Sequence, residues 1–173
     1  HPLIRAANPY LSQLASASGE TASLTEPVGL EMVYVAQLLT TKFIPVLTPV
    51  GMRIPMYCTS SGRAYLSALP PAQARALLET MPRPARTPAT LTDVDAILAR
   101  IALCRQTGYA TNHEELFLGD MGVAAPILNS KGQPVGAVHL SPPTSRWTIE
   151  EASRKLAPMV IECARAISLS IAH

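Results

Sequence analysis

The chain has 173 residues, of which 48% are hydrophobic and 15% are charged. This length and composition describe one folded domain with a sizeable core and exclude an intrinsically disordered chain. The formal net charge is only +2, and no run of basic residues stands out, so this piece is not expected to bind nucleic acid by itself. The sequence has no secretory signal and no apolar run long enough to span a bilayer, so no membrane contact is expected.

Three cysteines, Cys58, Cys104 and Cys163, are spread widely along the chain. An odd number at such spacing favours a reduced, cytoplasmic protein over a disulfide scaffold. The chain begins at His1 rather than Met, and we interpret it as a fragment whose partner domain is missing.

The first 50 residues predict a helix, two strands and an irregular segment. Apolar residues at helical spacing predict a helix over residues 2–18, which Gly19 ends. Residues 20–26 and 30–39 are predicted strands, and the second is apolar on both faces. Residues 40–50 contain Pro45 and Pro49, which indicates an irregular or edge segment.

Residues 51–66 predict a strand, a polar turn and the start of a helix. Pro55 favours an extended conformation for Ile54. The hydroxyl groups of residues 59–61 are preferred N-cap chemistry, and Gly62 allows close approach to the backbone. Unpartnered N–H groups at such a helix start favour an anion such as a carboxylate or phosphate. The alternative is an ordinary strand–turn–helix connection.

The middle of the chain is predicted to be mainly helical. Short helices are expected over residues 63–68 and 72–81, followed by a proline-rich loop over residues 81–88. The clearest interior helix covers residues 92–107, with Thr92 and Asp95 as a capping box and Gly108 after its end. An extended segment with a polar insert follows over residues 109–117.

The last third predicts a hairpin and a long helix. Strands over residues 122–128 and 133–141 flank a turn, and period-two geometry places Val135, Ala137, His139 and Ser141 on one face. The final helix begins at Thr148 with a capping box to Glu151. The order of elements predicts an α+β fold, in which helices pack on an antiparallel sheet.

Several short motifs occur in an order that resembles the effector-binding domain of the IclR family of bacterial transcription regulators. The resemblance covers essentially the whole chain. The motifs are His1-Pro2-Leu3, Gly19-Glu20-Thr21, Gly51 with Pro55, Ser61-Gly62-Arg63-Ala64-Tyr65-Leu66, Gly108-Tyr109-Ala110, Glu114-Glu115, Ala124-Ala125-Pro126-Ile127 and Ser141-Pro142. Each motif is weak alone, but eight in register are a strong signal.

This resemblance implies a GAF-like α/β (α+β) domain over residues 1–173, with a curved antiparallel sheet that cups a small-molecule pocket. It also implies that an N-terminal winged helix-turn-helix, absent from this chain, binds DNA in a homodimer or homotetramer. The domain is then a sensor rather than an enzyme, with no cofactor and no metal. Its expected effector is a small carboxylic acid, with an aromatic acid as one option.

The resemblance also implies which residues contact the effector. Backbone N–H groups of Ser60 and Ser61 are expected to meet its carboxylate. Asn112 stands where relatives often have Asp, and His139 stands where they commonly have Ser, so we expect a larger or differently polar acid than a two- or three-carbon one. The full expected contact set is Ser60, Ser61, Asn112, Gly122, His139 and Ser141, with Met52, Met56, Cys58 and Tyr65 as pocket wall.

Other interpretations of these residues remain open. Ser60 and Ser61 serve as caps in any helix start, His139 fits a core histidine bonded to backbone, and Asn112 fits a turn that satisfies only its own backbone. A small cytoplasmic hydrolase or isomerase using Cys58 and His139 is the alternative function. A metal site and a purely structural oligomerisation domain complete the alternatives; the metal site would use Cys58, His113, Glu114 and His139, which lack structural-zinc spacing.

Overall fold

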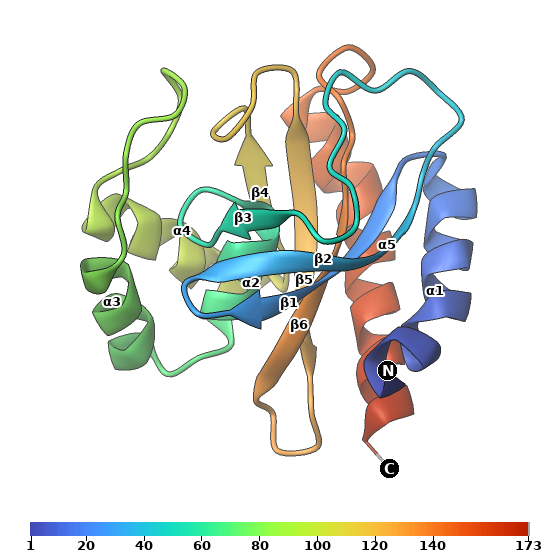
Figure 1. Ribbon diagram of the computed structural model, residues 1–173, viewed down its shortest axis with the longest axis horizontal. Coiled ribbons are helices and arrows are strands. Elements are labelled where there is room, and N and C mark those ends of the chain that lie inside the picture. The colour runs from blue at the N-terminus through green and yellow to red at the C-terminus, as the bar shows by residue number, and fades with distance from the viewer. Residues whose placement is uncertain (173) are drawn as a thin grey trace.

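One antiparallel sheet organises the molecule, in the order β3-β2-β1-β6-β5-β4. Figure 1 shows the computed structural model, which describes residues 1–172. Neighbouring strands are antiparallel at every pairing, so the predicted α+β sheet is confirmed. The strands are β1 (Ala22–Val28), β2 (Glu31–Leu38), β3 (Arg53–Pro55), β4 (Ala110–His113), β5 (Met121–Leu128) and β6 (Pro134–Leu140).

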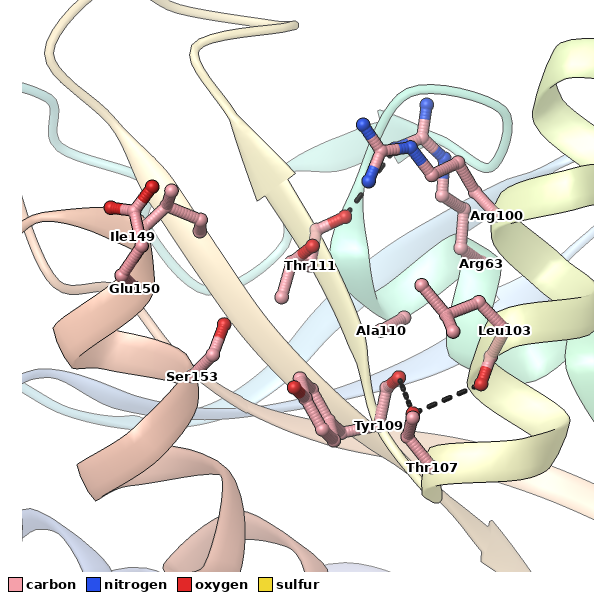
Figure 2. A pocket seen from close by; sticks show the side chains of 10 residues that line it. All are labelled: Arg63, Arg100, Leu103, Thr107, Tyr109, Ala110, Thr111, Ile149, Glu150 and Ser153. Carbon is pink, nitrogen blue, oxygen red and sulfur yellow. Dashed lines mark hydrogen bonds between the residues drawn. The ribbon is translucent and has the colours of Figure 1, made fainter.

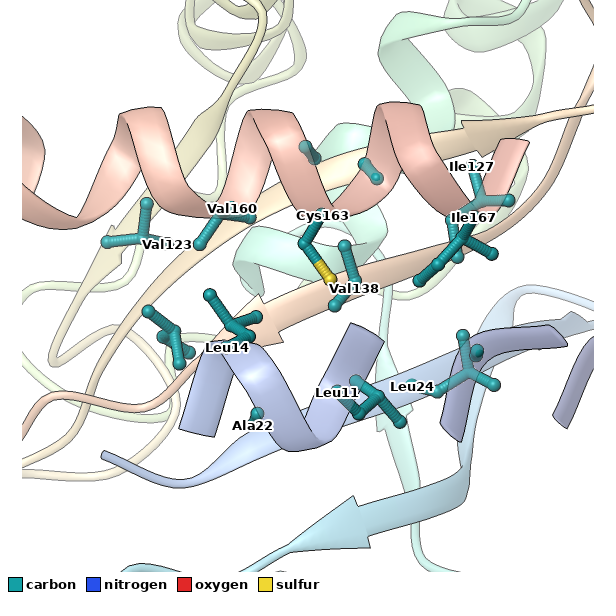
Figure 3. Packing of buried hydrophobic residues seen from close by; sticks show 14 of the residues in the cluster. Leu11, Leu14, Ala22, Leu24, Val123, Ile127, Val138, Val160, Cys163 and Ile167 are labelled. Atoms are coloured by element: carbon teal, nitrogen blue, oxygen red, sulfur yellow. The ribbon is translucent and has the colours of Figure 1, made fainter. Parts of the chain in front are cut away.

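Helices cover both faces of this sheet. On one face, α1 (Pro2–Ser18) and α5 (Ile149–Ile171) form an apolar cluster with β1, β5 and β6, and Figure 3 shows Leu11, Leu14, Val160 and Ile167 meeting there. On the other face lie α2 (Ser60–Ser67), α3 (Pro71–Thr80) and α4 (Val94–Thr107), which pack around a second apolar cluster. The strand residues alternate between these clusters because successive side chains point to opposite faces.

Helix ends follow local chemistry closely. Gly19 ends α1 with a left-handed φ of 71°, and Thr148 with Glu151 forms the predicted capping box of α5. The predicted cap of α4 is wrong by one residue. The N-cap is Asp93, whose carboxylate accepts a hydrogen bond from the Ala96 amide, while the Thr92 carbonyl accepts one from the Arg83 side chain. Adjacent Thr and Asp are both good caps, so tertiary contacts decide between them.

Strand β6 carries the predicted alternation with one exception. Val138 and Leu140 belong to the cluster under α1 and α5, whereas Ala137 belongs to the other cluster and His139 lies on its face. Val135 instead packs against the α1–α5 cluster. A register shift between Ile127 and Leu128 near the hairpin turn accompanies this change of face.

Residues 39–52 contain no helix or strand, as expected from their prolines. Their start is held to the sheet because the Thr40 amide donates to Thr21 Oγ1 and the Thr40 hydroxyl donates to the Gly19 carbonyl at 2.7 Å. Within the described part of the chain, no helix combines the length and apolar character needed to cross a membrane.

Candidate functional site

A small cavity lies on the sheet face covered by α2, and we call it the cup. Its volume is about 20 Å³, and about 320 Å³ when the adjoining open space is included. Segments far apart in the sequence line it: Tyr34, Thr48, Ile54, Thr59, Ser60, Ser61, Asn112, Leu116, Phe117, Asp120, Met121, Gly122, His139 and Ser141. The cup therefore exists only when the sheet, the start of α2 and two loops come together.

All the residues expected to contact an effector line the cup, namely Ser60, Ser61, Asn112, Gly122, His139 and Ser141. Sequence reasoning missed other lining residues, of which Tyr34, Thr48 and Asp120 are the polar ones apart from the cap Thr59. Asp120 stands two residues before Gly122, so its strand-end position was a usable signal. Tyr34 and Thr48 had no local signal, because only strand pairing brings them to the cup.

The start of α2 forms one wall of the cup. Thr59 caps the helix, since its hydroxyl accepts a hydrogen bond from the Gly62 amide at 3.2 Å and donates one to the Pro55 carbonyl at 2.6 Å. The Ser60 and Ser61 amides are first-turn groups that have no partner within a helix. A Cβ atom at Gly62 would lie 2.3 Å from Met56 Cα, so glycine is required for this turn to close. The turn that lines the cup is therefore also the positive end of the helix dipole, where the first N–H groups lack intrahelical partners.

Gly122 and Ser60 fit together across the cup. A Cβ atom at Gly122 would lie 2.2 Å from Ser60 Oγ and 3.0 Å from Ser60 Cβ. Gly122 is therefore needed because the Ser60 side chain occupies the space beside this strand. This contact sets how close α2 approaches β5.

His139 is a buried, neutral imidazole in the cup. Burial lowers its pKa to about 4 and raises the pKa of the Tyr34 hydroxyl to about 12, so both groups are uncharged near neutral pH. Tyr34 Oη lies 3.3 Å from His139 Nε2, and the two rings meet edge to face. The other ring nitrogen, His139 Nδ1, and the hydroxyl oxygen of Ser61 are buried without a hydrogen-bond partner in the described residues.

Asn112 has a structural role that leaves one end of its side chain free. Its Oδ1 accepts a hydrogen bond from the Glu115 amide at 3.0 Å. Because an N–H donor must face the oxygen, the NH₂ end of the amide points away from this bond. The local-backbone interpretation of Asn112 therefore applies to its oxygen, and its nitrogen remains a possible donor.

A buried ion pair holds the loop that closes the cup. Arg63 of α2 and Glu115 form two parallel hydrogen bonds of 2.6 Å, and Arg63 is only 1% exposed. Glu115 Oε1 also accepts from the Leu91 amide, and Arg63 Nε donates to the Tyr57 carbonyl. This network joins α2 to residues 112–120, which carry Leu116, Phe117 and Asp120 into the cup.

Asp120 is a further ionisable group at the cup with a shifted pKa. Burial raises the pKa of its carboxyl from 3.8 to about 7. Its backbone is extended and pairs with Pro143 in an isolated bridge, so this loop end is anchored to the segment after β6.

The expected wall residues, Met52, Met56, Cys58 and Tyr65, are not among the cup's lining residues and belong to other parts of the structure. Met56 and Cys58 are buried in the apolar cluster around α2, α3 and α4, and Met52 packs against it. Tyr65 lines an open groove beside the β5–β6 hairpin. The backbone turns at Thr59, so residues before the turn point into the core while the turn itself faces the cup.

Cys58 also lacks the properties of a catalytic nucleophile. Its side chain is fully buried, and burial raises its pKa to about 11, so it is a protonated thiol near neutral pH. His139 lines the cup, which Cys58 does not. Among residues 1–172, no group of three His, Cys, Asp or Glu side chains is arranged to hold a metal ion.

A larger groove, of about 290 Å³, runs along the edge strand β4 between α4 and the start of α5. Figure 2 shows Arg63 reaching the Thr111 carbonyl beneath it, with Arg100 on one side and Glu150 on the other. Of the expected contact residues, none lines this groove. The cup, not the larger groove, is therefore the candidate site.

The family model for the bacterial transcriptional regulator IclR C-terminal region matches residues 1–169. The chain belongs to this family. The crystal structure of the Thermotoga maritima IclR has the same fold, with a TM-score of 0.94 and 27% identity over all of this chain and 70% of that one. It confirms the α+β architecture of a curled antiparallel sheet with helices.

Relatives with described roles are transcription regulators rather than enzymes. The Pca regulon regulatory protein of Pseudomonas putida is 32% identical over 95% of this chain and 57% of its own length, so the chain spans less than two thirds of that relative. The inducer-binding domain of PobR from Acinetobacter, a double mutant in complex with 3-hydroxybenzoic acid, is 26% identical over 97% of both chains, with a TM-score of 0.85. The chain is thus the effector-binding domain of an IclR-type transcriptional regulator.

Proposed function

We propose that the cup binds a small carboxylic acid, and that its occupancy changes how the full-length regulator binds DNA. One observation carries this proposal. The open start of α2 meets two buried polar atoms without partners, Ser61 Oγ and His139 Nδ1, in the same cavity. Unpaired buried polar groups are costly, and a ligand with complementary groups removes that cost.

The acid group fits best at the start of α2. The Ser60 and Ser61 amides and the Ser61 hydroxyl donate hydrogen bonds there, and the helix dipole favours negative charge. The lining residues include no Lys or Arg, so recognition of the acid depends on neutral donors. His139, Tyr34 and the nitrogen of Asn112 provide further neutral contacts for the rest of the ligand.

An aromatic acid is the best-supported effector class. Ile54, Leu116, Phe117 and Met121 provide apolar contacts between the polar groups, and the related PobR domain was solved with 3-hydroxybenzoic acid. The cup's volume of about 20 Å³ gives room for about one water molecule. An acid of this size therefore requires the loops that carry Thr48 and Phe117 to move outward.

The regulatory step then follows from differential binding. An acid that fits one arrangement of the loops shifts the protein towards that arrangement by the difference in its binding free energy. We propose that the DNA-reading module lies in another part of the full-length protein, which assembles as a homodimer or homotetramer. The loop shift would change the spacing between those modules.

A thermal-shift screen of organic acids tests this proposal on protein freed of co-purified ligand. A bound acid raises the melting temperature by mass action, with about 2.7 kcal/mol of stabilisation at 100 times its Kd. Ser61→Ala should reduce the shift. The matched control is Ser67→Ala, on the same helix but outside the cup, which should keep it. Absence of a shift with every carboxylate would contradict the proposal.

A further inference from the structure

Asp120 occupies the boundary between the cup and a second small cavity. That second cavity, of about 10 Å³, lies under residues 44–48 and shares Thr48, Asp120 and Ser141 with the cup. Asp120 is the only acidic residue among the lining residues of either cavity in the part of the chain that the structure describes. A ligand that extends beyond the α2 end of the cup therefore reaches this carboxyl group.

The Asp120 carboxyl group has no hydrogen-bond or ion-pair partner among the described residues, and burial alone shifts its pKa. Two carboxylates that are more deeply buried behave differently. Glu20 is bonded to Arg146 and Trp147, and Glu115 is bonded to Arg63. Asp120 is half-buried, and a carboxyl group that is partly removed from water without a partner is costly; Asp120 lines a cavity instead of contacting an arginine.

The strand geometry sets the spacing between Asp120 and Gly122, the strand residue beside the expected acid position. Gly122 touches Ser60 at the start of α2, and Asp120 lies two residues earlier along the same extended segment. Two residues of extended chain span roughly 7 Å and place both positions on one face. A benzene ring that carries an acid and a second polar group bridges such a separation.

Resting on the proposed function, we propose that Asp120 accepts a hydrogen bond from a donor group of the effector, such as a hydroxyl. The site then selects hydroxy acids over the parent acids that lack the hydroxyl. A parent acid leaves Asp120 without a partner and adds a second negative charge nearby. A hydroxy acid satisfies the carboxylate, and hydrogen bonds to a charged group are the stronger kind.

The proposal also predicts how pH changes the preference. The hydroxyl binds the ionised carboxylate, whereas a parent acid binds best when Asp120 is protonated. The other titratable groups lining the cup, Tyr34 on β2 and His139 on β6, stay neutral between pH 6 and 8. The preference for the hydroxy acid should therefore increase over this pH interval.

Calorimetric titration with two matched pairs tests the proposal: benzoate with 3-hydroxybenzoate, and cyclohexanecarboxylate with 3-hydroxycyclohexanecarboxylate. In whichever pair binds, the wild-type protein should bind the hydroxy acid at least about tenfold more tightly than the parent acid at pH 8. Asp120→Ala should reduce this preference to within about twofold, and Asp120→Asn, which keeps the side-chain size, covers the case in which the alanine variant does not fold. Asp95→Asn, an exposed carboxylate on α4, is the control and should keep the preference.

The outcomes separate this proposal from the proposed function. Parent acids that bind as tightly as their hydroxy partners would overturn the role of Asp120 and leave the acid-binding cup intact. A preference that persists in both Asp120 variants would overturn it as well. If none of the four acids binds the wild-type protein, the acid-binding function fails for ligands of this size, and the Asp120 proposal fails with it.

Discussion

The two faces of the sheet differ in how many buried polar groups they contain. The face under α1 and α5 is closed by apolar side chains, of which Leu11, Val138 and Val160 are at most 1% exposed. The face under α2 combines an apolar cluster with a buried ion pair, a neutral histidine and an unpartnered carboxyl group. The first face stabilises the domain mainly by burial of apolar side chains. The second gives up some stability to keep polar groups ready at a cavity, as functional sites commonly do.

The difference shows where stability and recognition are separated. The sheet is shared, and side chains on alternate positions of β6 serve one role on each face. Changes on the α1–α5 face should therefore lower stability without changing ligand preference. Changes around the cup should alter pH dependence and binding, except where they remove the ion pair that holds the loop.

The largest effect is expected from breaking the Arg63–Glu115 pair. Arg63→Met leaves the Glu115 carboxylate buried without its cation, which should lower the free energy of unfolding by about 3–5 kcal/mol. Urea unfolding followed by circular dichroism measures this loss. Arg75→Met removes an exposed ion pair with Asp95 and should leave the unfolding midpoint nearly unchanged. Equal effects of the two variants would show that burial of the first pair is unimportant.

A cavity in the apolar face should cost nearly as much. Leu11 is 1% exposed between α1 and the sheet, so Leu11→Ala should lower the free energy of unfolding by about 2–5 kcal/mol. Ser61→Ala on the cup side removes a buried hydroxyl without a hydrogen-bond partner and should be neutral or stabilising. A destabilising Ser61→Ala would mean that this hydroxyl is satisfied in the ligand-free protein.

Asp120 should make stability fall with rising pH. Its folded pKa of about 7 lies above the usual 3.8, so the native state holds the proton longer than the unfolded state does. The contribution of Asp120 to the free energy of unfolding is therefore fully present below about pH 4 and is lost as the pH rises through 7. The free energy of unfolding of Asp120→Asn should therefore exceed that of the wild type by roughly 2 kcal/mol at pH 8. This is below the limit of about 4 kcal/mol that the full pKa shift would give, because part of the residue contacts solvent.

His139 should change stability in the opposite direction over a similar pH range, and this provides the control. Its folded pKa of about 4 lies below the usual 6.5, so its contribution is full above pH 6.5 and is lost as pH falls through 4. Thermal unfolding of His139→Gln and Asp120→Asn across pH 4–8 should give difference curves with opposite slopes. Parallel curves would contradict these assignments.

An effect of similar size to that of Asp120 is expected at the contact between Gly122 and Ser60. Gly122→Ala places a methyl group 2.2 Å from Ser60 Oγ, so the serine must rotate or α2 must shift, at a cost of about 1–3 kcal/mol. The Ser60→Ala, Gly122→Ala double variant removes the clashing oxygen and should recover most of this loss. A double-mutant cycle by urea unfolding measures the coupling, and strict additivity would exclude the contact.

The elements of the fold could be predicted from the sequence because their signals are local. The Thr148–Glu151 capping box and the glycine after α1 mark helix ends within a few residues. The alternation along β6 likewise predicted that His139 and Val138 point to opposite faces of the sheet. The cap of α4 was placed one residue early because adjacent Thr92 and Asp93 are both good caps, and it is Asp93 that accepts the hydrogen bond from the Ala96 amide.

The sequence by itself determined the family, the helix and strand pattern, and part of the cup lining, namely Ser60, Ser61, Asn112, Gly122, His139 and Ser141. The wall of the cup was decided by tertiary structure alone. Met56 and Cys58 turn into the core, and Tyr34, Thr48 and Asp120 arrive from distant segments. Local sequence patterns predict the face of a strand on which a side chain lies. Strand pairing and loop closure decide which distant side chains come together in one cavity. The charge state of Asp120 depends on that closure, because burial without a partner cannot be read from neighbouring residues.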